Sequence, residues 1–164
     1  IPSKLQRISD YTFSKCISLT EIKIPGNIRE IGYKSFSGCS GLREISIPST
    51  VKTVGIGAFE NCTELKDISL PTTLTEINYY TFSGCTSLTT LTLHSKLTAI
   101  NNYAFAGCKS LTEIHCKNSN PPLIGENTFR DVNRIGCKIF VPSKRAKKSY
   151  STALYWNEFT IYIE

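Results

Sequence analysis

A 23-residue motif recurs along most of this chain, and this period restricts the fold more than any other feature. Phenylalanine stands at the same place in five successive copies, and cysteine follows it three residues later: Phe13, Phe36, Phe59, Phe82 and Phe105, with Cys16, Cys39, Cys62, Cys85 and Cys108. Leucine follows the cysteine by three residues, and two more apolar residues come after it, as in Leu88, Leu91 and Leu93. Self-similarity at a fixed period of this length is typical of stacked-repeat solenoids.

Each copy is predicted to contain a short strand and a turn. Residues 19–24 have apolar side chains in the pattern L-x-x-I-x-I, and the last three residues alternate as a half-buried strand does. Pro25 ends the strand because it cannot donate to a sheet ladder. A second inward-facing pair, Ile28 and Ile31, recurs as Leu5/Ile8, Val51/Val54, Leu74/Ile77 and Leu97/Ile100. Residues 35–39 are too few for a long helix, so we expect one helical or 3-10 turn there. Stacked coils would pair their strands in parallel, with equivalent residues ~4.8 Å apart.

The pattern predicts two parts, a solenoid of about five coils over residues 1–142 and a C-terminal cap over 143–164. The coils become irregular from residue 117, because Phe129 stands one place later than the repeat would put it after Phe105, and two prolines interrupt the pattern before it. In the cap, Ser143 is a good helix N-cap. A helix face is predicted from Ala146, Tyr150, Ala153 and Leu154, and a closing strand from Phe159, Ile161 and Ile163.

The chain opens inside a copy of the repeat, since Ile1-Pro2 stands one full repeat before Ile24-Pro25. Solenoids need a polar cap at each end, and none is visible at the start. We therefore expect a fragment or processed form whose upstream residues, with any secretion signal and the initiator methionine, lie outside this sequence.

Six of the seven cysteines are predicted to be buried thiols rather than disulfides or metal ligands. Five occupy one phase of the repeat, and Cys116 occupies a phase otherwise filled by isoleucine or leucine. Cysteine at such positions behaves as a small hydrophobic residue. Cys-x-x-Cys is absent, and the two histidines, His94 and His115, do not have zinc-ligand spacing. Whether Cys137 is free stays open.

The strand motif L-x-x-I-x-I-P joined to F-x-x-C-x-x-L resembles the BspA-type leucine-rich repeats. The resemblance covers residues 1 to about 142, and the ending, with Val141-Pro142 followed by Tyr150, Trp156 and Phe159, is similar to the caps of that family. His94 and Lys117 depart from the pattern by replacing the strand-ending proline. The resemblance implies an α/β repeat solenoid of the leucine-rich-repeat fold, with short parallel strands, short helical or 3-10 turns and a C-terminal cap.

The resemblance also implies a function. Family members are surface proteins of Bacteroidetes and related bacteria, and of some parasitic protists, and as a rule they are not enzymes. We therefore expect a non-catalytic, cell-surface or secreted recognition module that adheres to a host protein or glycan. The alternative is a structural spacer that presents another domain of a longer surface protein. We expect a monomer without cofactors.

The least charged part of the chain is its middle, which carries the candidate ligand-binding residues. Between Ile68 and Thr112 the only charged residues are Glu76, Lys96 and Lys109. Candidate ligand-binding residues there are Tyr79, Tyr80, Tyr103, Thr89, Thr90 and Thr92. Tyrosine rings and hydroxyl groups suit sugar rings or a protein partner. The alternative is that these tyrosines only cover the outer edge of the coil.

The net charge of +6 comes largely from the run Lys144, Arg145, Lys147 and Lys148, which is a candidate anion-binding site. A solvated face of the cap helix explains the run equally well. No nucleic-acid-binding motif accompanies it, so we expect no nucleic-acid partner. The sequence also lacks an apolar run of eighteen residues, so we expect no membrane insertion of this part.

Catalytic motifs are absent from the sequence, including Gly-x-Ser-x-Gly, the P-loop and His-Glu-x-x-His. His115 is close in sequence to Cys116, but in a strand adjacent residues point to opposite faces, so the two cannot form a nucleophile pair. Glu21, Glu44, Asp67 and Glu113 are expected to stack as a broken acidic column that neighbouring basic residues neutralise. The sequence therefore predicts no catalytic, metal-binding or cofactor-binding residues.

Overall fold

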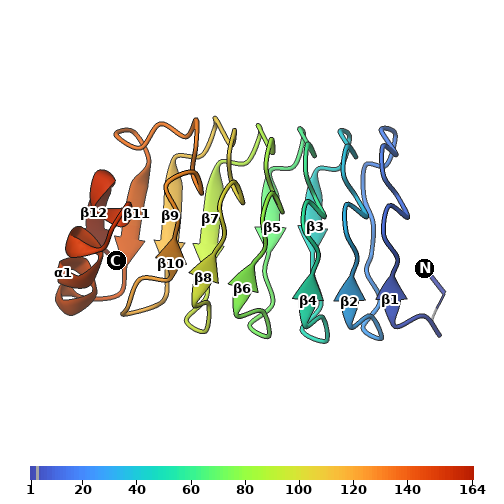
Figure 1. Ribbon diagram of the computed structural model, residues 1–164, viewed down its shortest axis with the longest axis horizontal. Helices are drawn as coiled ribbons and strands as arrows, with labels where there is room; N and C mark the ends of the chain where they lie inside the picture. The colour runs from blue at the N-terminus through green and yellow to red at the C-terminus, as the bar shows by residue number, and fades with distance from the viewer. Residues whose placement is uncertain (3) are drawn as a thin grey trace.

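The repeats form a stack of coils in which two sets of short strands alternate with turns (Figure 1). The computed structural model describes residues 1–2 and 4–164. Successive coils lie side by side in chain order, from the N-terminal coil in blue to α1 and β12 in red. The elements are β1 (Arg7–Ile8), β2 (Glu30–Ile31), β3 (Glu44–Ser46), β4 (Thr53–Val54), β5 (Asp67–Ser69), β6 (Glu76–Ile77), β7 (Thr90–Leu93), β8 (Ala99–Ile100), β9 (Glu113–Cys116), β10 (Leu123–Ile124), β11 (Lys138–Val141), α1 (Lys144–Thr152), the 3-10 helix η1 (Trp156–Glu158) and β12 (Thr160–Ile163).

All strand pairs are parallel, as the repeat predicts. The longer strands pair in the orders β3-β5 and β12-β11-β9-β7, and the two-residue strands pair as β1-β2-β4 and β10-β8-β6. Glu44 is opposite Asp67 and Thr90 is opposite Glu113, so paired residues are offset by one full repeat. Parallel strands in 23-residue repeats are thereby confirmed.

The irregular stretch after residue 117 contains two single-residue insertions. Leu93 pairs with Cys116 at the regular offset of one 23-residue repeat. Ala99 pairs with Leu123, so the offset there is one residue longer than the repeat. Glu113 pairs with Lys138, which is two residues more than the regular offset, so another residue enters between β10 and β11. Loops absorb both insertions, and the strands remain stacked.

A column of phenylalanine rings runs through the core. The five rings from Phe13 to Phe105, and Phe129 after them, stack with centroids 5.1 to 5.6 Å apart and with planes inclined by 15° or less. Each phenylalanine of this column from Phe36 onward is buried. The Phe59 N–H donates to the Thr81 carbonyl oxygen of the next coil at 2.9 Å, and equivalent residues of other coils repeat this bond. Ring stacking and hydrogen bonds thus join the same pairs of coils.

The cysteine column is a set of hydrogen-bond donors as well as a packing element. The Cys39 thiol lies 3.0 Å from the carbonyl oxygen of Phe13, and Cys62, Cys85 and Cys108 repeat the contact at 3.3 to 3.4 Å with the phenylalanine one coil earlier. The S–H group is a weak donor that leucine or alanine lacks. Burial raises the pKa of Cys39 to about 11 and the pKa of Cys62 to about 12. These thiols stay protonated and able to donate.

The first coil departs from the predictions because only one side of it is covered. Cys16 is exposed, whereas a buried position was predicted, and Leu5, predicted to face inward, is also exposed. Residues 19–24 do not form the predicted strand, although the Arg43 N–H donates to the Thr20 carbonyl oxygen. A coil at the end of the stack lacks the neighbour that would bury these side chains and complete the ladder.

The segment that closes each coil is a hydrogen-bonded turn, and the helical or 3-10 turn that the sequence predicts there is not confirmed. Hydrogen bonds of the i to i+3 type occur, as from the Cys39 N–H to the Phe36 carbonyl oxygen. However, Lys34 and Gly38 on either side have left-handed backbone, with φ of 46° and 76°. Left-handed residues at both ends prevent the segment from continuing as a helix.

The C-terminal segment lies at the far end of the stack. Ser143 precedes α1, and its hydroxyl oxygen accepts a hydrogen bond from the Ala146 N–H. The Trp156 indole donates to the Pro122 carbonyl oxygen at 2.8 Å, and β12 pairs with β11. Leu154 was predicted on the buried helix face but is exposed, because the helix ends at Thr152.

Truncation of Phe59 tests the importance of the ring column. Phe59 is fully buried between Phe36 and Phe82, so Phe59→Ala should lower the free energy of unfolding by ~3–5 kcal/mol in a denaturant titration. Leu123→Ala is the control, since Leu123 is 78% exposed and its loss should change stability by about 0.5 kcal/mol or less. Equal stability of the two variants would refute the core assignment.

Thiol titration tests the cysteine column. Among the seven cysteines, only Cys16 is exposed, and the other six are buried free thiols. A thiol reagent should therefore modify one cysteine rapidly in the native protein and all seven after unfolding. Rapid native-state reaction of all seven would contradict the buried column.

Candidate functional site

Two positions in every regular coil have left-handed backbone, and tyrosine occupies the first of them three times. Tyr11, Lys34, Gly57, Tyr80 and Tyr103 stand one repeat apart from each other, with φ of 58°, 46°, 62°, 59° and 63°. We call this set the left-handed column. Only glycine adopts this backbone without a steric penalty from Cβ. The chain thus places bulky side chains where glycine is the relaxed choice.

Tyr80 and Tyr103 stack on each other at the surface. Their ring centroids are 5.0 Å apart, and the ring planes are parallel within 2°. Tyr80 is 38% exposed and its neighbour Tyr79 is 45% exposed. The predicted adjacency of Tyr80 and Tyr103 on successive coils is confirmed.

The predicted threonines belong to a different sheet from the tyrosines. Thr90 and Thr92 are exposed on β7, and Thr89 precedes that strand, whereas Tyr79 and Tyr80 follow β6. Strands β6 and β7 are in separate sheets. The structure therefore brings the tyrosines together but does not join them to the threonines.

The acidic column lies along the outward face of the longer strands. An open hollow of about 510 Å³ is lined there by Glu21, Ile22, Lys23, Glu44, Ile45, Ser46, Asp67 and Ser69. Arg43 pairs with Glu64 at 3.2 Å rather than with the column. Within residues 1–2 and 4–164, no three His, Cys, Asp or Glu side chains converge as they would around a metal ion. The carboxylates are aligned but do not form a cation site.

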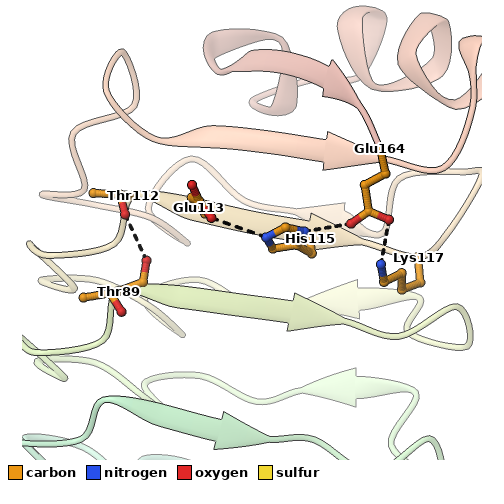
Figure 2. Close-up of polar contacts among 6 residues, drawn as sticks. All are labelled: Thr89, Thr112, Glu113, His115, Lys117 and Glu164. Carbon is orange, nitrogen blue, oxygen red and sulfur yellow. Dashed lines mark hydrogen bonds and ion pairs between the residues drawn. The ribbon is translucent and has the colours of Figure 1, made fainter.

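A polar cluster joins β9 to the end of β12 (Figure 2). The His115 Nδ1 atom lies 2.7 Å from Glu164 Oε1, and its Nε2 atom lies 3.5 Å from Glu113 Oε2. Lys117 Nζ contacts the other Glu164 oxygen at 2.6 Å. Since both ring nitrogens face carboxylates, both can donate only when the imidazole is protonated. These contacts tie the C-terminal strand to the solenoid.

An aromatic row continues from this cluster. His115 stacks on Phe140 with centroids 4.8 Å apart, and Phe140 lies 5.6 Å from Tyr162. Lys138 Nζ is 6.0 Å from the Tyr162 ring centroid. This row was not predicted from the sequence. The alternation of Ile139-Phe140-Val141 is the signal that places Phe140 outward beside His115.

The candidate anion-binding residues are all solvent-exposed on α1. Lys144, Arg145, Lys147 and Lys148 lie off its buried face, which contains Ala146 and Tyr150. None of the four forms an ion pair with any residue that the structure describes. They are available to an external anion or to solvent.

Two buried thiols, Cys116 and Cys137, lie outside the regular cysteine column. Burial raises the pKa of Cys116 and of Cys137 to about 12 each, which keeps both thiols protonated and unreactive.

In the part of the chain that the structure describes, no helix has the length and apolar character needed to cross a membrane.

The Glu164 contacts make part of the stability depend on pH. Hydrogen bonds from Lys117 and His115 lower the pKa of Glu164 below its ordinary value. A carboxyl group whose pKa is lower in the folded state stabilises the fold fully at pH values above its unfolded-state pKa. This stabilisation is lost as the pH falls through the lowered, folded-state pKa. The melting temperature of the wild type should exceed that of Glu164→Gln at pH 7, and the two should converge below about pH 4. A difference of the same size at pH 3 and pH 7 would contradict this.

Comparison with known proteins agrees with this geometry. A leucine-rich cell surface protein from Faecalibacterium prausnitzii is 30% identical, with a TM-score of 0.69, over 80% of this chain and 35% of that one. A leucine-rich repeat protein of T. pallidum is 29% identical, with a TM-score of 0.66, over 70% of this chain and 56% of that one. A leucine-rich repeat protein from Eubacterium ventriosum is 28% identical, with a TM-score of 0.62, over 80% of this chain and 42% of that one. This chain thus spans between about a third and somewhat over half of their lengths. No curated protein matches it.

The family model for the BspA type leucine rich repeat region matches six copies, over residues 1–112 and 31–154. The matched residues cover nearly the whole chain, including all five phenylalanine-cysteine repeats. The chain belongs to the BspA-type leucine-rich repeat family.

Proposed function

We propose that this chain is a non-catalytic recognition module of a cell-surface or secreted protein, which binds a host protein or glycan through Tyr79, Tyr80 and Tyr103. A structurally similar protein is described as a cell surface protein, which supports the location. Regularly stacked coils present side chains at fixed spacing, which suits recognition of an extended ligand.

The left-handed backbone of Tyr80 and Tyr103 is the observation that carries this proposal. A left-handed residue other than glycine costs roughly 1–2 kcal/mol. Stacking of the two aromatic rings stabilises the fold by ~0.5–1.5 kcal/mol for the pair. Gly57 at the equivalent position shows that the coil closes without a tyrosine. Because the rings are partly exposed, core packing does not explain why the chain keeps them there, and strained surface residues are often functional.

Two other surfaces, the basic residues of α1 and the exposed threonines of the other sheet, are alternative binding sites. The basic residues of α1 would bind an anionic ligand, and such binding would weaken with added salt. A spacer would bind nothing through any of these surfaces. The exposed threonines Thr89, Thr90 and Thr92 lie on a different sheet, so their substitution tests a separate face.

Replacement of both tyrosines by glycine separates binding from stability. The double variant Tyr80→Gly, Tyr103→Gly removes the rings and relaxes the backbone, so its free energy of unfolding should stay within about 1 kcal/mol of the wild type. Binding to an array of host-matrix proteins and glycans at physiological salt should fall by about tenfold or more.

Tyr11→Gly is the matched control, because Tyr11 has the same left-handed backbone but lies near the N-terminus, where its ring meets Tyr33 edge to face at 83°. The control should retain full binding. Binding that survives the double variant would remove the tyrosines from the site. Loss of binding on charge reversal of Lys144, Arg145, Lys147 and Lys148 would assign it to α1. An array without any ligand would favour the spacer.

A further inference from the structure

The strands of the solenoid divide into two groups at the loop between β5 and β6 (Figure 1). The sheets β1-β2-β4 and β3-β5 contain the strands before residue 70, and the sheets β10-β8-β6 and β12-β11-β9-β7 contain those after residue 75. Among the described residues, no strand of the first group pairs with a strand of the second. We call residues 4–69 the N-terminal block and residues 76–164 the C-terminal block.

The ladder of the two-residue strands stops between β4 and β6. Within the C-terminal block, the Asn101 N–H donates to the Ile77 carbonyl oxygen at 2.9 Å, and the N-terminal block contains equivalent bonds. In the part of the chain that the structure describes, no backbone hydrogen bond joins β4 to β6. The Asn78 side-chain amide donates to the Val54 carbonyl oxygen at 2.8 Å instead. A side chain thus replaces the backbone donor at this boundary.

The ladder of the longer strands stops between β5 and β7. The Lys66 N–H donates to the Arg43 carbonyl oxygen at 2.8 Å within the N-terminal block, and the Thr112 N–H donates to the Thr89 carbonyl oxygen at 2.9 Å within the C-terminal block. Over residues 1–2 and 4–164, no backbone hydrogen bond joins β5 to β7. Both ladders are therefore interrupted on either side of residues 70–75.

Packing is also looser at this boundary. Leu70 is only partly buried, whereas the residues at the same phase of other coils are buried: Ile24, Ile47, Leu93 and Cys116. A void too narrow for a water molecule lies beside Leu70, and its lining includes Val54, Leu74 and Phe82. Side chains that line such a void lose part of their van der Waals contacts.

The turns hold the two blocks together. The rings of Phe59 and Phe82 stack with centroids 5.4 Å apart and planes inclined by 4°. The Phe59 N–H donates to the Thr81 carbonyl oxygen at 2.9 Å, and the Asn61 N–H donates to the Ser83 carbonyl oxygen at 2.7 Å. Since these backbone bonds lie on the turn side of the coils, the strand sides can separate while the turns stay joined.

We infer that residues 70–75 are a hinge that divides the solenoid into two blocks, which open and unfold separately. The stability of a repeat stack is the sum of its repeats and of the interfaces between neighbouring repeats, so the weakest interface sets where the stack opens. Tyr79, Tyr80 and Tyr103 belong to the C-terminal block, and the hollow lined by Glu44 and Asp67 belongs to the N-terminal block. The hinge lets these two surfaces change their relative orientation.

The buried cysteines report on the two blocks separately. The N-terminal block contains the buried thiols Cys39 and Cys62, and the C-terminal block contains Cys85, Cys108, Cys116 and Cys137. A pulse of thiol reagent at increasing urea concentration, followed by mass spectrometry of the modified peptides, gives an unfolding midpoint for each cysteine. Exposed Cys16 reacts at every urea concentration and calibrates the pulse.

Two midpoints are expected. Cys39 and Cys62 should become reactive together, about 0.5 M urea or more below the midpoint that the other four cysteines share, because the N-terminal block has an uncovered end coil. The fluorescence of Trp156, the only tryptophan, should follow the higher midpoint. One midpoint for all six buried cysteines would overturn the hinge. An even increase of the midpoint from coil to coil would also overturn it, since this is the result of fraying from the N-terminal end.

Removal of the Asn78 side chain tests the boundary itself. Asn78→Ala removes the bond to the Val54 carbonyl oxygen, so it should widen the separation of the two midpoints. Asn101→Ala is the matched control, because Asn101 stands one repeat later and its backbone N–H still bonds to the Ile77 carbonyl oxygen. The control should not widen the separation. Equal separations in the wild type and Asn78→Ala would place the weak interface elsewhere and refute the hinge.

Discussion

The spacing of about 5 Å between successive coils is the constraint on which this structure depends. Side chains of the core meet the equivalent side chains of the next coil, so a residue must pack well at this spacing against the same or a similar residue. Flat rings satisfy this condition, as the phenylalanine centroid spacings of 5.1 to 5.6 Å show. Backbone hydrogen bonds between the same coils hold the spacing, for example from the Phe36 N–H to the Ala58 carbonyl oxygen.

The cysteines meet the same constraint by combining small size with a hydrogen-bond donor. The Phe13 carbonyl oxygen accepts from the Cys16 N–H within its own coil and from the Cys39 thiol of the next coil. A buried carbonyl oxygen has two lone pairs, and the thiol uses the second one. This explains why cysteine, rather than alanine, fits beneath the ring column.

Most of the solenoid was predictable because the repeat itself encodes it. The register of one full repeat, the parallel pairing and the contact of Tyr80 with Tyr103 all follow from residues that share a phase. The burial predicted for Cys16 and Leu5 was wrong because no coil covers them on the N-terminal side of the stack. The burial predicted for Leu154 was wrong because this residue lies after the end of α1. The contact of His115 with Glu164 joins residues far apart in the chain, and no repeat phase relates them.

The candidate site was only partly visible in the sequence, for reasons of local backbone. The sequence indicated the tyrosines because few charged residues surround them. It did not indicate their left-handed backbone. Glycine marks such backbone at Gly38, Gly84 and Gly107, whereas the left-handed column contains glycine only at Gly57.

A crystal structure of the chain with its best-binding ligand tests the account most directly. The account predicts a ligand in contact with the rings of Tyr79, Tyr80 and Tyr103. A ligand bound only elsewhere, such as along Phe140 and Tyr162, would contradict it.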